Sequence, residues 1–374
     1  MARFTALERI TLPLIVLLTA LAGVANYQVW APVPRFAIAT LALAGLAWVV
    51  SFATEQLGER FGPAITGMMQ STLGNLPELF VVIFALQKGE LVVAQTAIIG
   101  SIFANAMLVL GLVIVVGAYR SRDGMMRFSD RLPRDTTTLL LVAVFIIVLL
   151  GLSLASHDPA SHHVNTISAV GAVSLLIVYF AWVVPYLRAD TAPGGEGDGA
   201  SADDPRAKEG GAAGPEGGGS EPRLSLSLTL GLLLTAGVAS AFVSDWFVNG
   251  LSPAIVQLKI SQAFAGLVIV AIAGNAVENT AGLVLAWKGR SDLAISVVKN
   301  SVAQIAAFLF PLLVLISFLL ATTLTFALAP VYIGAFLVMA LALWQITGDG
   351  EAAAFEGWAL VALYVILATL TLYE

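Results

Sequence analysis

Long apolar runs, separated by short charged or Pro/Gly-rich breaks, follow one another along the whole chain. A helix needs about 20 largely apolar residues to cross a bilayer. Eleven runs meet or approach this length, so the pattern predicts an all-α integral membrane protein with eleven transmembrane helices. The first run resembles a signal peptide, but no small-residue cleavage site follows it, which favours a membrane helix. The expected spans are 10–30, 35–54, 61–87, 91–118, 136–156, 164–187, 224–248, 260–287, 292–320, 324–346 and 356–373.

The composition agrees with a membrane protein, because 59% of the residues are hydrophobic and 11% are charged, with a mean hydropathy of +0.92. Soluble domains carry about 25% charged residues. The absence of cysteine excludes disulfides, thiolate metal sites and cysteine nucleophiles. No basic patch with interleaved aromatic residues occurs, so we expect the lipid bilayer as a partner and no nucleic acid.

One segment, residues 189–223, differs from the rest of the chain in composition. It holds ten glycines, eight acidic residues and three basic residues. Such a sequence cannot bury a core, so it predicts a flexible cytoplasmic linker. A regulatory acidic tether that collects cations is the alternative interpretation.

Basic residues are distributed unequally between the two ends of the predicted spans. Cytoplasmic loops of membrane proteins carry an excess of Lys and Arg. With the N-terminus inside, the inner segments hold 14 basic residues and the outer segments hold 3. We therefore predict a multi-pass protein of the cell membrane with a cytoplasmic N-terminus and an external C-terminus. The outer residues are Arg35, Lys88 and Lys259, and the inner ones include Arg120, Arg122, Arg127, Arg131 and Arg134.

The chain on either side of the linker repeats at a constant offset of 200 residues. Spans 2–6 and 7–11 form two sets of five. Because five is odd, the two sets enter the membrane from opposite sides, which predicts inverted repeats with a substrate site near the midplane. The predicted units are 1–34, 35–188, 189–223 and 224–374. The matched residues are Gly74-Asn75 with Gly274-Asn275, Glu78 with Glu278, Lys88-Gly89 with Lys288-Gly289, and Ser101 with Ser301.

Two carboxylates, Glu78 and Glu278, lie inside apolar spans, where a charge is costly and marks a candidate functional site. Asparagines three residues earlier share their helix faces. Hard oxygen ligands with two formal negative charges suit Ca²⁺, which takes about six to eight oxygens. Without the ion, two neighbouring buried carboxylates favour protonation. The alternative is a structural ion pair, for which Lys299 is the one base inside a span. The candidate set is Asn75, Asn275, Ser101, Asn105, Ser301 and Gln304 beside the two glutamates.

These motifs resemble the calcium/proton exchangers of the calcium/cation antiporter superfamily. The likeness rests on GNLPELFVVIFALQKGE and IIGSIFANAMLVLGL in the first half, and on GNAVEN and NSVAQI in the second. It implies a sodium/calcium exchanger-like fold, with a peripheral first helix and two inverted five-helix repeats. It also implies export of Ca²⁺ in exchange for H⁺ by alternating access. Glu78 and Glu278 would bind Ca²⁺ or protons, with Asn75, Asn275 and Gln304 as supporting ligands.

Several residues depart from the pattern of that family. Pro77 replaces a threonine and predicts either a kink or a freed carbonyl, near Leu73 or Gly74, that could bind the ion. Gln70 stands where the family has asparagine. Asn279 replaces a histidine that would titrate near neutral pH.

Lys299 is the departure with the largest potential effect. An ammonium at the site would compete with Ca²⁺ directly. On an ideal helix, however, Lys299 points roughly 170° away from Ser301 and Gln304. It lies about 12 Å into its span, from where its side chain can extend towards the cytoplasm. We expect a packing or gating role.

The sequence leaves other functions open. One is exchange coupled to Na⁺, or exchange of another divalent cation such as Mn²⁺. Another is a transport-inactive relative that acts as a sensor or scaffold. A channel fits inverted repeats less well. We expect no catalytic activity and no cofactor, and a homo-oligomer remains open.

Overall fold

The computed structural model describes residues 4–58, 60, 73–129, 131–191 and 224–374. Within these residues, nine helices are long and apolar enough to cross a membrane, and one bent pair forms a tenth candidate. The predicted third span, 61–87, is described only in its second part, as α4 (Leu76–Gln87). The structure therefore agrees with ten of the predicted spans, and the count of eleven stays a prediction.

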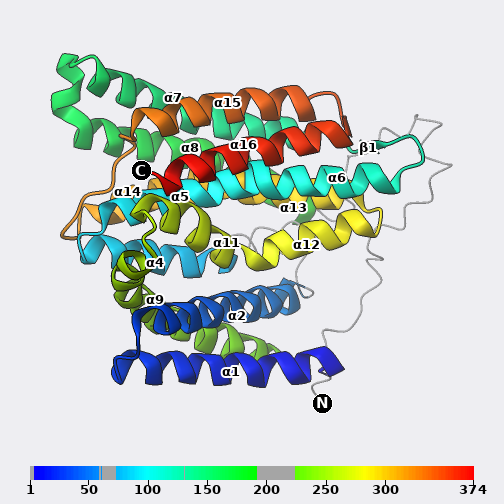
Figure 1. Cartoon of the computed structure of the whole chain (residues 1–374). Helices are drawn as coiled ribbons and strands as arrows, with labels where there is room; N and C mark the ends of the chain where they lie inside the picture. The colour runs from blue at the N-terminus through cyan, green and yellow to red at the C-terminus, as the bar shows by residue number, and fades with distance from the viewer. Residues whose placement is uncertain (1–3, 59, 61–72, 130, 192–223) are drawn as a thin grey trace.

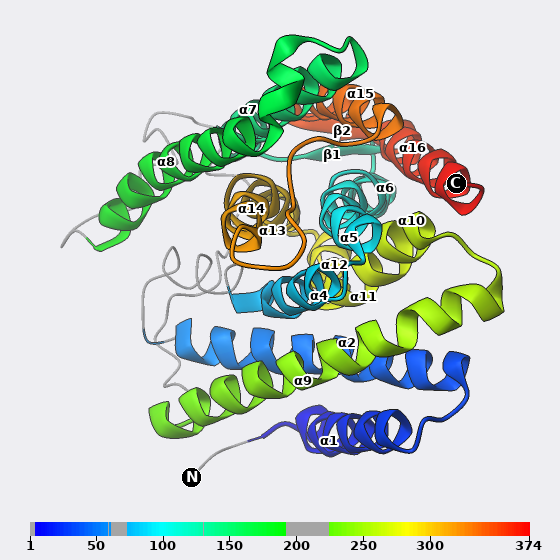
Figure 2. The same ribbon diagram turned by 90° about the vertical axis from the view of Figure 1, so that its left-hand side faces the viewer.

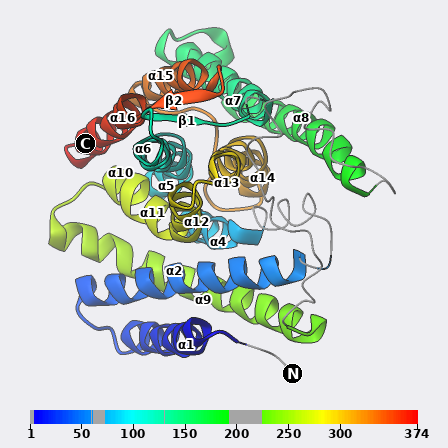
Figure 3. The ribbon, with the colours of Figure 1, turned by 90° about the vertical axis from the view of Figure 1, so that its right-hand side faces the viewer.

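The long helices lie side by side, with α1 at one edge of the bundle (Figure 1). The first helix packs on α2 and α9, which cross each other beside it (Figures 2 and 3). Its start is fixed by a capping box, in which Thr5 N–H donates to Glu8 (2.8 Å) and Glu8 N–H donates to Thr5 Oγ1 (3.2 Å). The bounds of the first-half helices are α1 Ala6–Tyr27, α2 Pro32–Gly58, α5 Leu91–Phe103, η1 Ala104–Val109, α6 Leu110–Arg120, α7 Arg131–Ala155, η2 Pro159–His163 and α8 Val164–Thr191.

The second half begins at α9. Its helices are α9 Leu226–Leu258, α10 Gln262–Phe264, η4 Ala265–Val270, α11 Ala271–Gly274, α12 Ala276–Trp287, α13 Ser291–Gln304, η5 Ile305–Leu309, α14 Phe310–Ser317, α15 Pro330–Thr347 and α16 Ala354–Leu372. α1 begins and α16 ends at opposite ends of the bundle (Figure 1). This is the arrangement that an odd number of crossings produces.

Three expectations need correction. The chain is not entirely helical, because β1 (Met125–Arg127) pairs antiparallel with β2 (Glu351–Ala353). α9 continues to Leu258, ten residues beyond the expected end at 248. The tenth span begins at Pro330 rather than at 324, since Ser317 bonds the backbone of Leu324 and holds the preceding segment in a non-helical turn. Most of the predicted linker, 192–223, lies outside the described residues.

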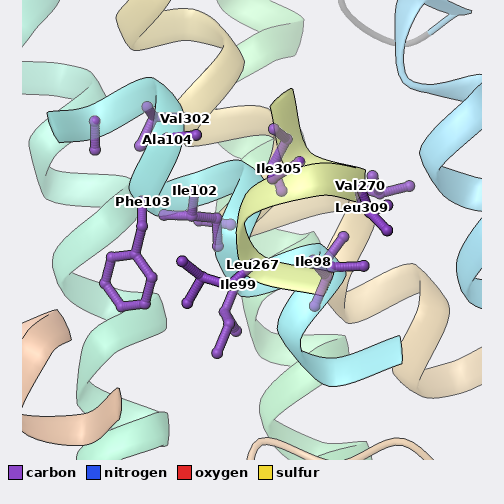
Figure 4. Packing of buried hydrophobic residues seen from close by; sticks show 14 of the residues in the cluster. Ile98, Ile99, Ile102, Phe103, Ala104, Leu267, Val270, Val302, Ile305 and Leu309 are labelled. Carbon is purple, nitrogen blue, oxygen red and sulfur yellow. The ribbon is translucent and has the colours of Figure 1, made fainter. Parts of the chain in front are cut away.

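Buried hydrophobic side chains of α5, η4 and η5 pack against one another in the core (Figure 4). Small residues permit this approach: a Cβ on Gly100 would lie 2.5 Å from the Leu267 Cα, and a Cβ on Gly266 would lie 3.0 Å from the Ala97 nitrogen. Close backbone contact between small residues is a common basis of helix packing in membranes. It brings α5 from the first half directly against η4 from the second.

Candidate functional site

Both GN motifs lie at breaks between helices. Asn75 precedes α4 with φ −84° and ψ 9°, and Asn275 separates α11 from α12 with φ −92° and ψ 12°. At the second break, the flanking helical segments are bent by 57°. Broken helices near the midplane are a common basis of ion sites in transporters.

Pro77 lies directly after the break in the first half. It lies in the first turn of α4, where a backbone N–H has no partner within the helix in any case. The matching break at Asn275 forms without a proline. Pro77 is therefore a residue of the helix start, and its predicted effect on the carbonyls of Leu73 and Gly74 stays a prediction.

Glu78 is a point of contact between the two halves of the chain. It lies in the first turn of α4 and is 3% exposed. A Cβ on Gly274 would lie 2.8 Å from Cδ of Glu78, so the carboxyl group rests on the GN motif of the other half. The N-terminal end of a helix carries a partial positive charge, which favours an anionic side chain in this turn.

A second contact is a buried network of four polar side chains. The Asn275 amide donates to Ser101 Oγ (2.9 Å) and to the Ala271 carbonyl (2.8 Å). Asn105 Nδ2 donates to Asn275 Oδ1 (2.9 Å) and to Ser301 Oγ (3.1 Å). The four side chains are at most 2% exposed. The structure thus brings four of the predicted site residues into contact: Ser101, Asn105, Asn275 and Ser301.

Gln304 departs from this network. The side chain is 4% exposed and lies towards the hydroxyl group of Tyr179 on α8. Its Oε1, like the Tyr179 hydroxyl, completes no hydrogen bond within the described residues. Sequence reasoning missed Tyr179, because an aromatic residue in an apolar helix carries no signal of such a contact. Asn279 Oδ1 is also buried without a hydrogen-bond partner in this part of the chain.

Lys299 points away from the network, as its helical position predicts. Its Nζ donates to Thr137 Oγ1 on α7 (2.9 Å) and to Thr347 Oγ1 on α15 (2.7 Å). The side chain is 3% exposed, beside a cavity of about 10 Å³. Two threonine hydroxyls thus hold the ammonium inside the bundle, between α7 and α15.

For two predicted site residues, the structure does not describe the side chain. Gln70 lies outside the described residues, as does the side chain of Glu278, whose backbone is in the first turn of α12. Asn75 is 3% exposed beside the start of α4. No group of three or more His, Cys, Asp or Glu side chains with metal-site geometry occurs among the described residues. An ion here would therefore depend on carboxylates together with amide and hydroxyl oxygens.

The sequence matches a known protein family and several of its described members. Residues 32–186 and 228–373 match the sodium/calcium exchanger protein family. A Ca(2+)/H(+) antiporter of Aphanothece halophytica is 30% identical over 342 residues, which are 90% of this chain and 90% of that protein.

Two solved structures have a similar fold. The structure of YfkE aligns with a TM-score of 0.77 at 24% identity and covers 98% of this chain and 100% of the other. The H+/Ca2+ exchanger CAX aligns with a TM-score of 0.72 at 14% identity, over 98% and 93% of the two chains. The matched breaks at Asn75 and Asn275 lie within the two segments that match the family. The chain thus belongs to the sodium/calcium exchanger protein family.

Proposed function

We propose that the protein is a Ca²⁺/H⁺ antiporter that exports Ca²⁺ from the cytoplasm by alternating access. The observation that carries the proposal is the buried Glu78 carboxyl group, which rests on Gly274 of the opposite half. A carboxylate at the contact between two halves can bind an ion whose release requires the halves to rearrange. The similarity to a relative named as a Ca(2+)/H(+) antiporter supports this choice of ions.

In this proposal the ion site combines charged and neutral oxygen ligands. The carboxylates supply the charge that a divalent cation requires, and the network supplies the neutral ligands. In the network, Asn275 Oδ1, Ser101 Oγ and Ser301 Oγ accept hydrogen bonds from amide N–H groups, and an oxygen that accepts one such bond can still contact a cation through its second lone pair. The proposed ligands are Glu78, Glu278, Asn75, Asn275, Ser101, Ser301 and Gln304.

Proton coupling follows from the same carboxylates. An anionic Glu78 in a buried position is costly unless an ion neutralises it. When Ca²⁺ leaves, a proton on the carboxylate removes that cost. We assign the same role to Glu278. Competition between Ca²⁺ and H⁺ for these two groups then links export of one to import of the other.

We also propose eleven transmembrane helices, with two inverted five-helix repeats after α1 and a cytoplasmic N-terminus. The matched elements α4 and α12, offset by 200 residues, support the repeats. The basic residues at the α6 and α12 ends of the bundle support the orientation.

Transport of ⁴⁵Ca²⁺ into proteoliposomes tests this function. A pH gradient, a Na⁺ gradient or no gradient is imposed in turn, and Mn²⁺ is added as a competitor. We expect uptake with the pH gradient alone. Uptake with only the Na⁺ gradient would replace H⁺ by Na⁺ as the coupling ion, and no uptake under any gradient would favour a sensor or scaffold.

Substitution of the two carboxylates tests the site. Glu78→Gln and Glu278→Gln keep the side-chain size and remove the charge, so we expect each to abolish exchange. Glu55→Gln is the matched control, because Glu55 is exposed at the end of α2 and most of the exchange should remain. Robust transport by either of the first two variants would contradict the assignment.

A further inference from the structure

Three basic side chains gather at one end of the bundle. Arg120 ends α6, and Lys288 and Arg290 flank Gly289 in the turn between α12 and α13. Arg120 reaches this turn, since its Nε lies 3.4 Å from the position of a Cβ on Gly289. Within the described residues, none of the three side chains forms an ion pair or a hydrogen bond.

The acidic residues near this end have contacts other than ion pairs with these three cations. Asp123 pairs with Arg127 at 2.6 Å, and Glu351 contacts the same guanidinium at 3.5 Å. Asp292 accepts a backbone N–H at 2.6 Å, and Glu356 accepts another at 2.7 Å. Within the described residues, the three cations are therefore not paired with any of these carboxylates.

Large aromatic side chains border the cations. Trp287, next to Lys288, is 70% exposed, and Tyr119, next to Arg120, is 70% exposed. Trp358 of α16 is 48% exposed and donates its Nε1–H to the Tyr119 hydroxyl at 3.4 Å. In a membrane protein, exposed Trp and Tyr at helix ends mark the depth of the lipid headgroups. The ends of α6, α12 and α16 lie at the same end of the bundle, near β1 (Figure 1).

We propose that this basic–aromatic patch binds the phosphate headgroup of an anionic phospholipid. The patch comprises Tyr119, Arg120, Trp287, Lys288, Arg290 and Trp358. The charge of the three cations complements a phosphodiester, and the rings place them where headgroups lie. α6 belongs to the first half and the α12–α13 turn to the second, so one bound phosphate bridges the two halves. This inference requires only that the chain spans a membrane, and it is independent of the transported ion.

Lipid binding to the full-length, detergent-solubilised protein tests the proposal. Phosphatidylglycerol or phosphatidylcholine is titrated into the micelles, and lipid retention and Tm are measured. Each Lys or Arg near an anionic surface contributes about a five-fold change in affinity. We therefore expect Arg120→Gln/Lys288→Gln to retain phosphatidylglycerol about 30-fold more weakly than the original protein.

The matched control is Arg9→Gln/Lys259→Gln, which removes two exposed cations outside the patch. It should retain phosphatidylglycerol as the original protein does. Retention and Tm are compared in phosphatidylcholine as well, so that a variant that merely folds poorly is recognised by a low Tm in both lipids. If the double variant folds poorly in this sense, the single variant Arg290→Gln takes its place, and its retention of phosphatidylglycerol is compared with that of the original protein.

Three results would overturn the inference. One is equal loss of retention in the patch and control variants, which would indicate diffuse electrostatic attraction. Another is stabilisation by inorganic phosphate equal to that by the lipid, which would indicate a soluble ligand. The third is retention that does not depend on lipid charge, as expected if the acidic segment 189–223 occupied the patch.

Discussion

Gly274→Ala tests the contact between the two halves directly. The added Cβ would lie 2.8 Å from Cδ and 3.0 Å from Cγ of Glu78. Non-bonded carbon atoms prefer separations of about 3.5–4.0 Å, so the carboxyl group must shift by about 0.7 Å or more. Extra methyl groups in a packed interior cost about 1–3 kcal/mol. Because the shift displaces the proposed ion ligand itself, we expect this cost to appear mainly as weaker Ca²⁺ binding.

A cost of about 1–3 kcal/mol corresponds to about a 5- to 150-fold rise in the Kd for Ca²⁺. The assay is the initial rate of ⁴⁵Ca²⁺ uptake against Ca²⁺ concentration at a fixed pH gradient, with Tm measured on the same preparations. Gly237→Ala is the control, since its Cβ would meet only Leu76 Cδ1 at 3.8 Å, an ordinary contact. A Gly274→Ala protein with an unchanged Tm and an unchanged KM for Ca²⁺ would refute the proposed position of the ion at Glu78.

Three further substitutions separate structural from functional roles. Asn275→Ala should lower Tm and abolish uptake, because it leaves buried partners of the network without a hydrogen bond at about 1–3 kcal/mol each; an unchanged Tm would argue against the network. Lys299→Met should leave the KM for Ca²⁺ unchanged, because the ammonium is held away from the site; a lower KM would mean that it competes with the ion. Asp123→Asn should leave Tm at neutral pH unchanged, because this carboxylate and Arg127 are exposed and screened by solvent. The hydrogen bond from Arg127 lowers the pKa of Asp123. Any contribution of this pair to the free energy of unfolding is therefore present at neutral pH and is lost as the pH falls through that pKa.

The sequence predicted the convergence of the two halves because the relevant positions repeat at one offset. Ser101, Asn105, Asn275 and Ser301 carry polar atoms in spans that are otherwise apolar, and a buried polar group must find a partner. The pairing itself required the fold, since hydropathy places a residue within a span but does not orient it. Gln304 illustrates this limit: it was grouped with the network by its spacing, yet it faces α8.

Other features left no readable signal. Strands of three residues in the loops after α6 and before α16 are too short to show an alternating pattern. The threonines that bind Lys299 lie 162 and 48 residues from it in the chain, so no local motif connects them. Pro77 drew attention to the break in the first half, but the matching break at Asn275 has no proline to mark it in the sequence.

The β1–β2 sheet restricts how the bundle can move. Met125–Arg127, in the loop after α6, is paired with Glu351–Ala353, in the loop before α16. Separating these loops would break backbone hydrogen bonds at the edge of the membrane, whereas turning them together would preserve the ladder. The small sheet thus joins a loop of the first half to a loop of the second half at this end. If the site opens by the alternating access proposed above, we expect these two loops to move together, with the larger displacements at the far ends of the helices.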